Sequence, residues 1–173
     1  MMRSAIVACV LIACGDSAPT RVDAPPQQMI DAAACSPMGT GTVTGSVAGA
    51  EIAPVIAARV TTYVGVPTIV LVETAAPNPC GAPMSSPGDY LNMFVCTKAV
   101  GSYPMSGSFP TCPGSSGAAV FGVQVQTMTA LYKATGGMVT IATVDTACTT
   151  GMYSITFDSG DTVSGAFAAH SCP

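Results

Sequence analysis

The chain has 173 residues, of which only 8% are charged, and its formal net charge at neutral pH is −4. Soluble proteins typically have about 25% charged residues. Phosphate recognition requires clustered Lys and Arg, and this chain has five such residues in total. The composition therefore argues against nucleic acid as a partner and against electrostatic binding to anionic lipid.

Residues 1–14 have the pattern of an export signal. Arg3 precedes an uncharged apolar run over residues 5–13, which matches a positive start, a short apolar core and a small residue before cleavage. The run is far shorter than the ~20 residues of a membrane-spanning helix. Its ending, Leu11-Ile12-Ala13-Cys14, resembles the lipobox of bacterial lipoproteins, which implies that residues 1–13 are removed and Cys14 is acylated.

Two alternatives to acylation at Cys14 stay open. Ile6-Val7-Ala8-Cys9 also fits the lipobox loosely, although the apolar core before Cys9 would be only about four residues against the ~7–15 expected. An ordinary signal peptide cut nearby would leave Cys14 as a simple thiol. Gly15, rather than an aspartate, follows Cys14. By the sorting rule for lipoproteins, the expected location is the cell envelope, with a lipid anchor in the outer membrane.

Residues 14–40 are expected to form a disordered tether. They contain a loose Asp-Ala-Pro repeat without aromatic residues, and repeated proline favours extended, solvated backbone. No periodic apolar face is present to bury. The remaining residues, 41–173, are expected to form one domain.

Six cysteines lie outside the export signal. An even number in an exported chain predicts three disulfides, whereas a metal site requires close pairs and these cysteines are at least sixteen residues apart. Six cysteines allow fifteen pairings, so the connectivity stays open. The predicted disulfide residues are Cys35, Cys80, Cys96, Cys112, Cys148 and Cys172.

Short β-like runs alternate with turns from residue 40 onward. Residues 68–73 are almost wholly apolar, as in a strand that is buried on both faces. Residues 55–63 could begin as a short helix after Pro54, but residues 59–63 resemble a strand. In the first half of the domain the expected strands are 42–47, 59–63, 68–73, 90–95 and 101–104.

The C-terminal third shows the clearest alternation. Apolar residues alternate with small or polar ones over 121–126, 139–142 and 153–157, which places Gln124 and Gln126 on the wet face. Residues 158–161 read Asp-Ser-Gly-Asp, a hairpin signal before a strand at 162–167. About eight strands at regular spacing predict an all-β fold, an antiparallel β-sandwich or barrel.

These segments resemble a group of uncharacterised lipoproteins from large-genome Gram-negative bacteria. The resemblance rests on the lipobox with its Asp-Ala-Pro tether and on short motifs over residues 41–172. It implies a β domain and carries no known activity. The motifs are residues 68–72 running to Cys80, Gly101-Ser102-Tyr103-Pro104, Gly137-Met138-Val139-Thr140-Ile141, and residues 154–169 closed by Cys172.

A strand at 42–47 pairing antiparallel with one at 162–167 would place the start of the first beside the end of the second. Cys35 and Cys172 lie at those two ends. The predicted bridge is therefore Cys35 to Cys172.

No catalytic constellation is visible. His170 is the one histidine and lies three residues from the end of the chain, where a frayed terminal residue is expected. No Gly-x-Ser-x-Gly motif supplies a nucleophile beside it. Residues 114–117 read Gly-Ser-Ser-Gly but lack the Lys of a phosphate loop. The methionines form no Met-x-x-Met cluster for copper. No cofactor, metal site or enzymatic activity is predicted.

The carboxylates leave one enzymatic alternative open. Asp158 and Asp161 flank the expected turn, and their spacing does not match a calcium-binding EF-hand loop. Glu51, Glu73 and Asp89, together with Asp145, stand apart in the sequence, yet glycosidase carboxylates come from distant strands. Two acids facing each other in a cleft would favour an enzyme, whereas acids on turns would argue against one.

The leading hypothesis is a non-enzymatic structural or interaction module on the membrane, in contact with another envelope protein or a glycan. The alternative is a lipoprotein that binds a small molecule or glycan at the mouth or open face of the β domain. A lined apolar cavity would favour this alternative, and a side-chain-filled interior would count against it.

Overall fold

The computed structural model describes residues 35–55, 57–73, 80, 88–110, 117–125 and 128–172. These residues form nine strands, and none of them lies in a helix. No helix in the described part of the chain is long and apolar enough to span a membrane. The predicted signal peptide and most of the predicted tether lie outside the described residues.

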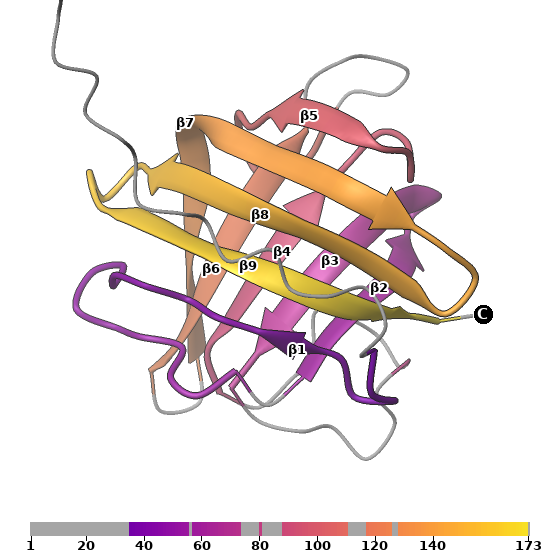
Figure 1. The fold of residues 1–173 in the computed structure, drawn as a ribbon. Helices are drawn as coiled ribbons and strands as arrows, with labels where there is room; N and C mark the ends of the chain where they lie inside the picture. Colours follow the sequence, from indigo (N-terminus) through magenta and orange to yellow (C-terminus); the bar gives the residue numbers. More distant parts are fainter. Residues whose placement is uncertain are drawn as a thin grey trace, which may run out of the picture.

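Seven strands close into a barrel, in the order β9-β2-β3-β4-β6-β7-β8 and back to β9 (Figure 1). β1 pairs with β9 and β5 pairs with β7, so these two short strands extend the barrel wall. The strands are β1 (Thr40–Gly41), β2 (Ala57–Tyr63), β3 (Val66–Val72), β4 (Tyr90–Phe94), β5 (Gly101–Pro104), β6 (Ala118–Val125), β7 (Met128–Val144), β8 (Cys148–Phe157) and β9 (Thr162–Ser171).

The all-β prediction is confirmed, and the structure adds the closure. All the strand pairs are antiparallel except β2 and β9, which run parallel and join through Arg59–His170 and Val60–Ser171. This short parallel contact turns an open sheet into a barrel. Residues 55–63, for which a helical start after Pro54 was the alternative, contain no helix in their described part, and the strand β2 already begins at Ala57.

Apolar side chains fill the interior of the barrel. On β7 and β8 the predicted alternation is confirmed, because Val139, Ile141 and Ile155 are buried. Phe121 on β6 and Phe157 on β8 meet edge to face, with ring centroids 5.8 Å apart. The interior is therefore a packed core, which counts against a ligand in the barrel mouth. Other members of this core are Ile69, Leu71, Leu91, Met93, Tyr153, Val163 and Phe167.

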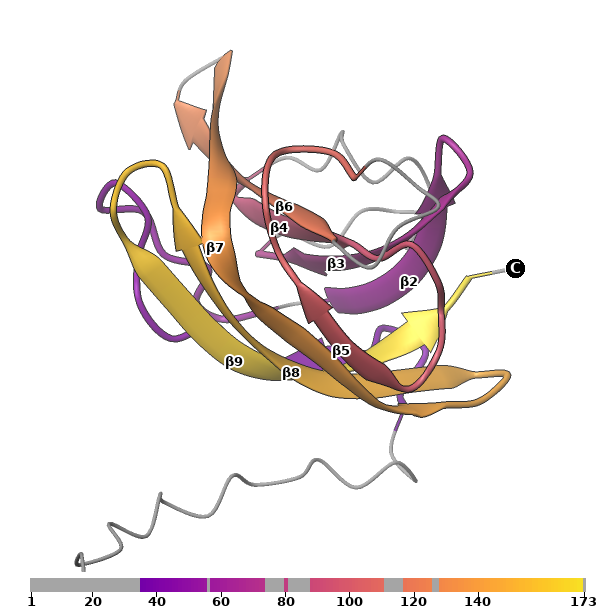
Figure 2. The same ribbon diagram turned by 90° about the horizontal axis from the view of Figure 1, so that it is seen from above.

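β7 belongs to two walls of the barrel, which Figure 2 shows from above. Residues 128–133 pair with β6, and residues 134–144 pair with β8. The register between β7 and β8 shifts at Ala134–Gly136, and Gly137 follows with φ +117°. A bulge followed by a positive-φ glycine bends the strand, so a single strand serves both walls.

The predicted pairing of the N-terminal segment with the C-terminal strand is confirmed. Thr42 N–H donates to Ala166 O at 2.9 Å, and Thr44 N–H donates to Ser164 O at 2.7 Å. The prediction of a strand at 42–47 is wrong, because the regular strand β1 covers only Thr40–Gly41 and Thr44 forms a single isolated bridge to Ser164. Gly45 has φ +100°, and positive φ at residues 48 and 49 turns the chain away from β9.

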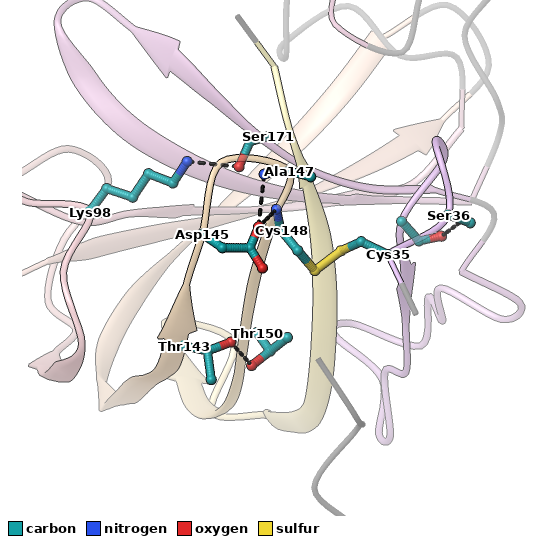
Figure 3. Close-up of a disulfide and its surroundings, with 10 residues drawn as sticks. Cys35, Ser36, Lys98, Thr143, Asp145, Ala147, Cys148, Thr150 and Ser171 are labelled. Carbon is teal, nitrogen blue, oxygen red and sulfur yellow. Dashed lines mark hydrogen bonds between the residues drawn. A yellow bond between two sulfur atoms is a disulfide. The ribbon is translucent and has the colours of Figure 1, made fainter. Parts of the chain in front are cut away.

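The predicted bridge from Cys35 to Cys172 is wrong. Cys35 is bonded to Cys148 (Figure 3). Cys80 is bonded to Cys172. The prediction considered β1 and β9 alone, but β8 lies on the other side of β9 and places Cys148 opposite His170. Cys172 N–H instead donates to Val60 O on β2.

A further cysteine is also oxidised. Cys96 is disulfide-bonded, and Cys112 lies outside the described residues. The five described cysteines are all disulfide-bonded, which agrees with the prediction that they form disulfides.

The outer face of β2, β3 and β4 is buried as well. The prediction that 68–73 forms a strand covered on both faces is confirmed, since Val70 and Val72 on the outer face are fully buried. Arg59 and Asn92 lie on the same outer row, at 1% and 0% exposure. Burial lowers the pKa of the Arg59 guanidinium. This row is part of the scaffold and not an open surface.

Candidate functional site

A groove of about 580 Å³ crosses the outer face of β7, β8 and β9. It lies on the wall of the barrel opposite β2, β3 and β4, whose outer face is also buried. On the wall that carries the groove, the outer side chains are open to solvent. The residues that line it are Thr42, Met138, Thr140, Met152, Tyr153, Ser154, Ser164, Gly165 and Ala166.

Strand register builds the floor of the groove from two rows. One row joins Thr140, Met152 and Ala166, and the other joins Met138, Ser154 and Ser164. The residues between them in sequence, such as Val139 and Tyr153, belong to the core. Because side chains alternate along each strand, the packed core fixes which residues face the groove.

Thr42 forms one wall of the groove. Its Oγ1 accepts a hydrogen bond from Ala166 N–H at 3.1 Å. Its carbonyl accepts a hydrogen bond from the Tyr153 hydroxyl at 2.8 Å. Burial raises the pKa of Tyr153, so this hydroxyl stays a donor at physiological pH. A Cβ at Gly165 would stand 1.9 Å from Thr42 O, so only glycine allows the wall to sit this close to β9.

The lining of the groove combines hydroxyl groups with apolar side chains and carries no charge. Ser and Thr hydroxyls can donate and accept hydrogen bonds, and one of them, Thr140 Oγ1, lies 3.1 Å from Ser102 Oγ on β5. Met138 is 42% exposed, and flexible thioether side chains adapt to varied apolar surfaces. The groove therefore suits a neutral ligand with both polar and apolar groups.

The carboxylates of the turns hold backbone amides. Asp145 accepts N–H groups of Ala147 and Cys148 (Figure 3). Asp158 accepts Lys133 N–H at 3.2 Å, and Glu73 accepts Asp89 N–H at 3.4 Å. These carboxylates have a structural role in turns.

Asp161 ties two turns together. Its Oδ2 accepts Ala48 N–H at 2.8 Å, which connects the β8–β9 turn to the turn after β1. This hydrogen bond, followed by one with the Ser159 side chain, lowers the pKa of Asp161. The turn predicted at 158–161 is confirmed, and the carboxylates of its two aspartates bind backbone amides of neighbouring segments, at Lys133 and Ala48.

His170 is not a frayed terminal residue. It lies inside β9, opposite Cys148 on β8 and opposite Arg59 on β2. Its Nδ1 is buried and has no hydrogen-bond partner in the described part of the molecule. The barrel closure orders this end of the chain, which sequence position alone could not show.

Several predicted features fall outside the described residues. They are Cys9, Cys14, Cys112, residues 114–116 and the side chains of Gln124 and Gln126. Within the described ranges, no group of three or more His, Cys, Asp or Glu residues is placed to hold a metal ion.

The sequence pattern did not predict the groove. Its residues come from three strands and from Thr42, which lies more than a hundred residues before Ser154. Ser and Thr at alternate positions of the last strands are typical of a solvent-exposed face. That pattern did not show that β5 and the Thr42 segment flank this face.

The fold and the groove define the class of protein: a small disulfide-bonded β-barrel with a packed interior and an open groove on its outer wall. No protein-family model matches the sequence, and comparison with curated proteins and with solved structures found no match.

Proposed function

We propose that this protein is a non-enzymatic interaction module, exported and held at the bacterial cell envelope by a lipid on Cys14. The lipobox at residues 11–14 and the resemblance to envelope lipoproteins support the anchor. The bridges Cys35–Cys148 and Cys80–Cys172 are typical of an oxidising compartment. The expected destination is the outer membrane.

The observation that carries the interaction role is the contrast between the two sides of the barrel wall. The interior is filled, whereas the outer groove is open and lined by uncharged hydroxyls and methionines. Rigid strands hold these side chains in place, which lowers the entropic cost of binding. The groove is therefore the part of the described surface best suited to a partner.

A neutral segment of another envelope protein fits this lining best. Met138 and Met152 offer adaptable apolar contacts, and the Ser and Thr hydroxyls can pair with a backbone. A neutral glycan is the second candidate because the same hydroxyls could bind sugar hydroxyls. The groove offers no exposed aromatic platform for stacking, since Tyr153 is buried.

Replacing Cys14 with serine tests the anchor. We expect the intact mass of the variant to lack the acyl chains and the protein to leave the membrane fraction, because serine cannot form the thioether. Cys9→Ser is the matched control and should keep both the acyl mass and the membrane location. Loss of acylation in Cys9→Ser with retention in Cys14→Ser would overturn the assignment.

A photo-reactive phenylalanine at Ser154 tests the groove. In cells, we expect a protease-sensitive adduct that disappears when Ala166→Arg blocks the groove, because both positions line it. Ala142→Arg, at an exposed position of β7 outside the lining, should leave the adduct intact. An adduct that survives Ala166→Arg would contradict the role of the groove, and a protease-resistant adduct would favour a glycan.

A further inference from the structure

The turn between β2 and β3 holds an apolar residue in an unfavourable backbone conformation. Val64 and Gly65 are the central residues of a two-residue hairpin closed by Tyr63 and Val66. Their φ values are +49° and +78°, as in a type I′ turn, where Asn-Gly is preferred. Positive φ is strained for a β-branched residue such as valine.

The fold gains nothing visible from this valine. Val64 is 76% exposed, so its side chain is not part of the core, and a Cβ on neighbouring Gly65 would meet no atom within 4 Å. A residue that is both strained and exposed is unfavourable for stability on two counts. Strain of this kind is found at functional positions.

Val64 stands beside an aromatic cluster. The ring of Tyr63 lies 6.1 Å from that of Phe94 and 6.1 Å from that of Phe109, and the rings of Phe94 and Phe109 are 5.2 Å apart. Phe109 is 44% exposed, whereas Phe94 is buried in the wall. We call Tyr63, Val64 and Phe109 the apolar tip.

We propose that the apolar tip docks into the lipid bilayer that carries the Cys14 anchor, an inference that rests on the proposed function. The tip is a hairpin end and not a groove, so it suits a fluid surface better than a shaped partner. Residues 60–72 and 99–110 contain no charged side chain, and an uncharged apolar loop can enter the headgroup boundary without desolvating an ion.

Because the lipid on Cys14 holds the domain near the membrane, a small apolar tip is sufficient for docking. Twenty residues lie between Cys14 and Cys35, and a chain of that length spans about 25 Å as a flexible coil and at most about 60 Å as an extended proline-rich segment. The domain then stays close to the membrane, and docking becomes an intramolecular step with a high effective concentration. One exposed valine and one half-exposed phenylalanine would be weak ligands for a membrane without that anchor.

The chain has no tryptophan, so Val64→Trp gives a single fluorescent reporter. We expect its emission in full-length acylated protein, reconstituted in vesicles of equimolar phosphatidylethanolamine and phosphatidylglycerol, to be quenched by brominated phosphatidylcholine. The control is Leu131→Trp on β7, at a position that is 56% exposed and outside the tip. Quenching should be several-fold stronger at position 64 than at position 131.

A second reporter separates docking from folding. In a Phe109→Trp protein, the added change Val64→Asn should raise the melting temperature, because Asn-Gly suits this turn, and should weaken the quenching of Trp at position 109. A more stable protein with undiminished quenching would overturn the role of Val64.

The remaining outcomes are also decisive. Equal or absent quenching at positions 64 and 131 in protein with an acylated mass would overturn docking and leave the anchor standing. Emission that shifts to the blue with protein density, without lipid quenching, would assign the tip to a second copy. An unacylated mass would contradict the anchor. Quenching of this unacylated protein by added vesicles would then test whether the apolar tip docks into lipid.

Discussion

Replacing Gly137 with alanine is expected to lower the free energy of unfolding by about 3–5 kcal/mol, which is near the upper limit for a single substitution. Gly137 has φ +117°, and a Cβ there would lie 2.3 Å from Ser154 O and 2.6 Å from Ile155 Cα. Both contacts are with backbone atoms of β8, so no side-chain rotation can relieve them. Urea denaturation of the oxidised protein measures the loss.

Gly136→Ala is the matched control for this substitution. A Cβ at Gly136 would meet no atom within 4 Å, so alanine should change the stability by no more than roughly 0.5–1 kcal/mol. The two glycines are adjacent in β7 and differ in backbone conformation and surroundings. Equal effects at both positions would show that the bend of β7 does not depend on Gly137.

Removal of the Cys35–Cys148 bridge by the double change Cys35→Ala and Cys148→Ala is expected to cost about 2–4 kcal/mol. The two cysteines are 113 residues apart, and a disulfide that closes a long loop restricts the unfolded chain strongly. The folded state should also loosen where Cys35 is released, because residues 40–44 then lose their nearby covalent tie and keep only non-covalent contacts with β8, β9 and the core. Hydrogen exchange at the Thr42 and Thr44 amides should accelerate.

The second bridge provides the comparison. The double change Cys80→Ala and Cys172→Ala removes a bridge across 92 residues and should lower global stability by a similar amount. Exchange at Thr42 and Thr44 should then change little, since Cys35 still holds the N-terminal segment. Faster exchange at those amides in both proteins would mean that the N-terminal segment has no specific dependence on Cys35.

The sequence was sufficient for the elements that depend on neighbouring residues. Alternation over residues 139–142 and 153–157 predicted which side chains are buried, because a strand places successive side chains on opposite faces. The continuous apolar run at 68–73 predicted burial on both faces. The Asp-Ser-Gly-Asp segment predicted the turn between β8 and β9. Each of these signals lies within a few residues of the feature it predicts.

The site depended on contacts that a local pattern does not contain. Arg59 lies in an ordinary strand pattern, and only the covered outer wall shows that it is buried. The groove exists because β7, β8, β9 and Thr42 meet in one register. Nothing in the alternation of a single strand specifies which strand lies beside it.

By itself the sequence determined that the described part of this protein is an all-β domain stabilised by disulfides. Tertiary structure alone decided that the sheet closes through β2 and β9, that Cys35 pairs with Cys148, and that Tyr63, next to the exposed Val64, packs against Phe109. The physical reason is the range of the interactions. Strand formation follows from side chains a few residues apart, whereas closure, disulfide pairing and surface shape follow from how distant segments pack.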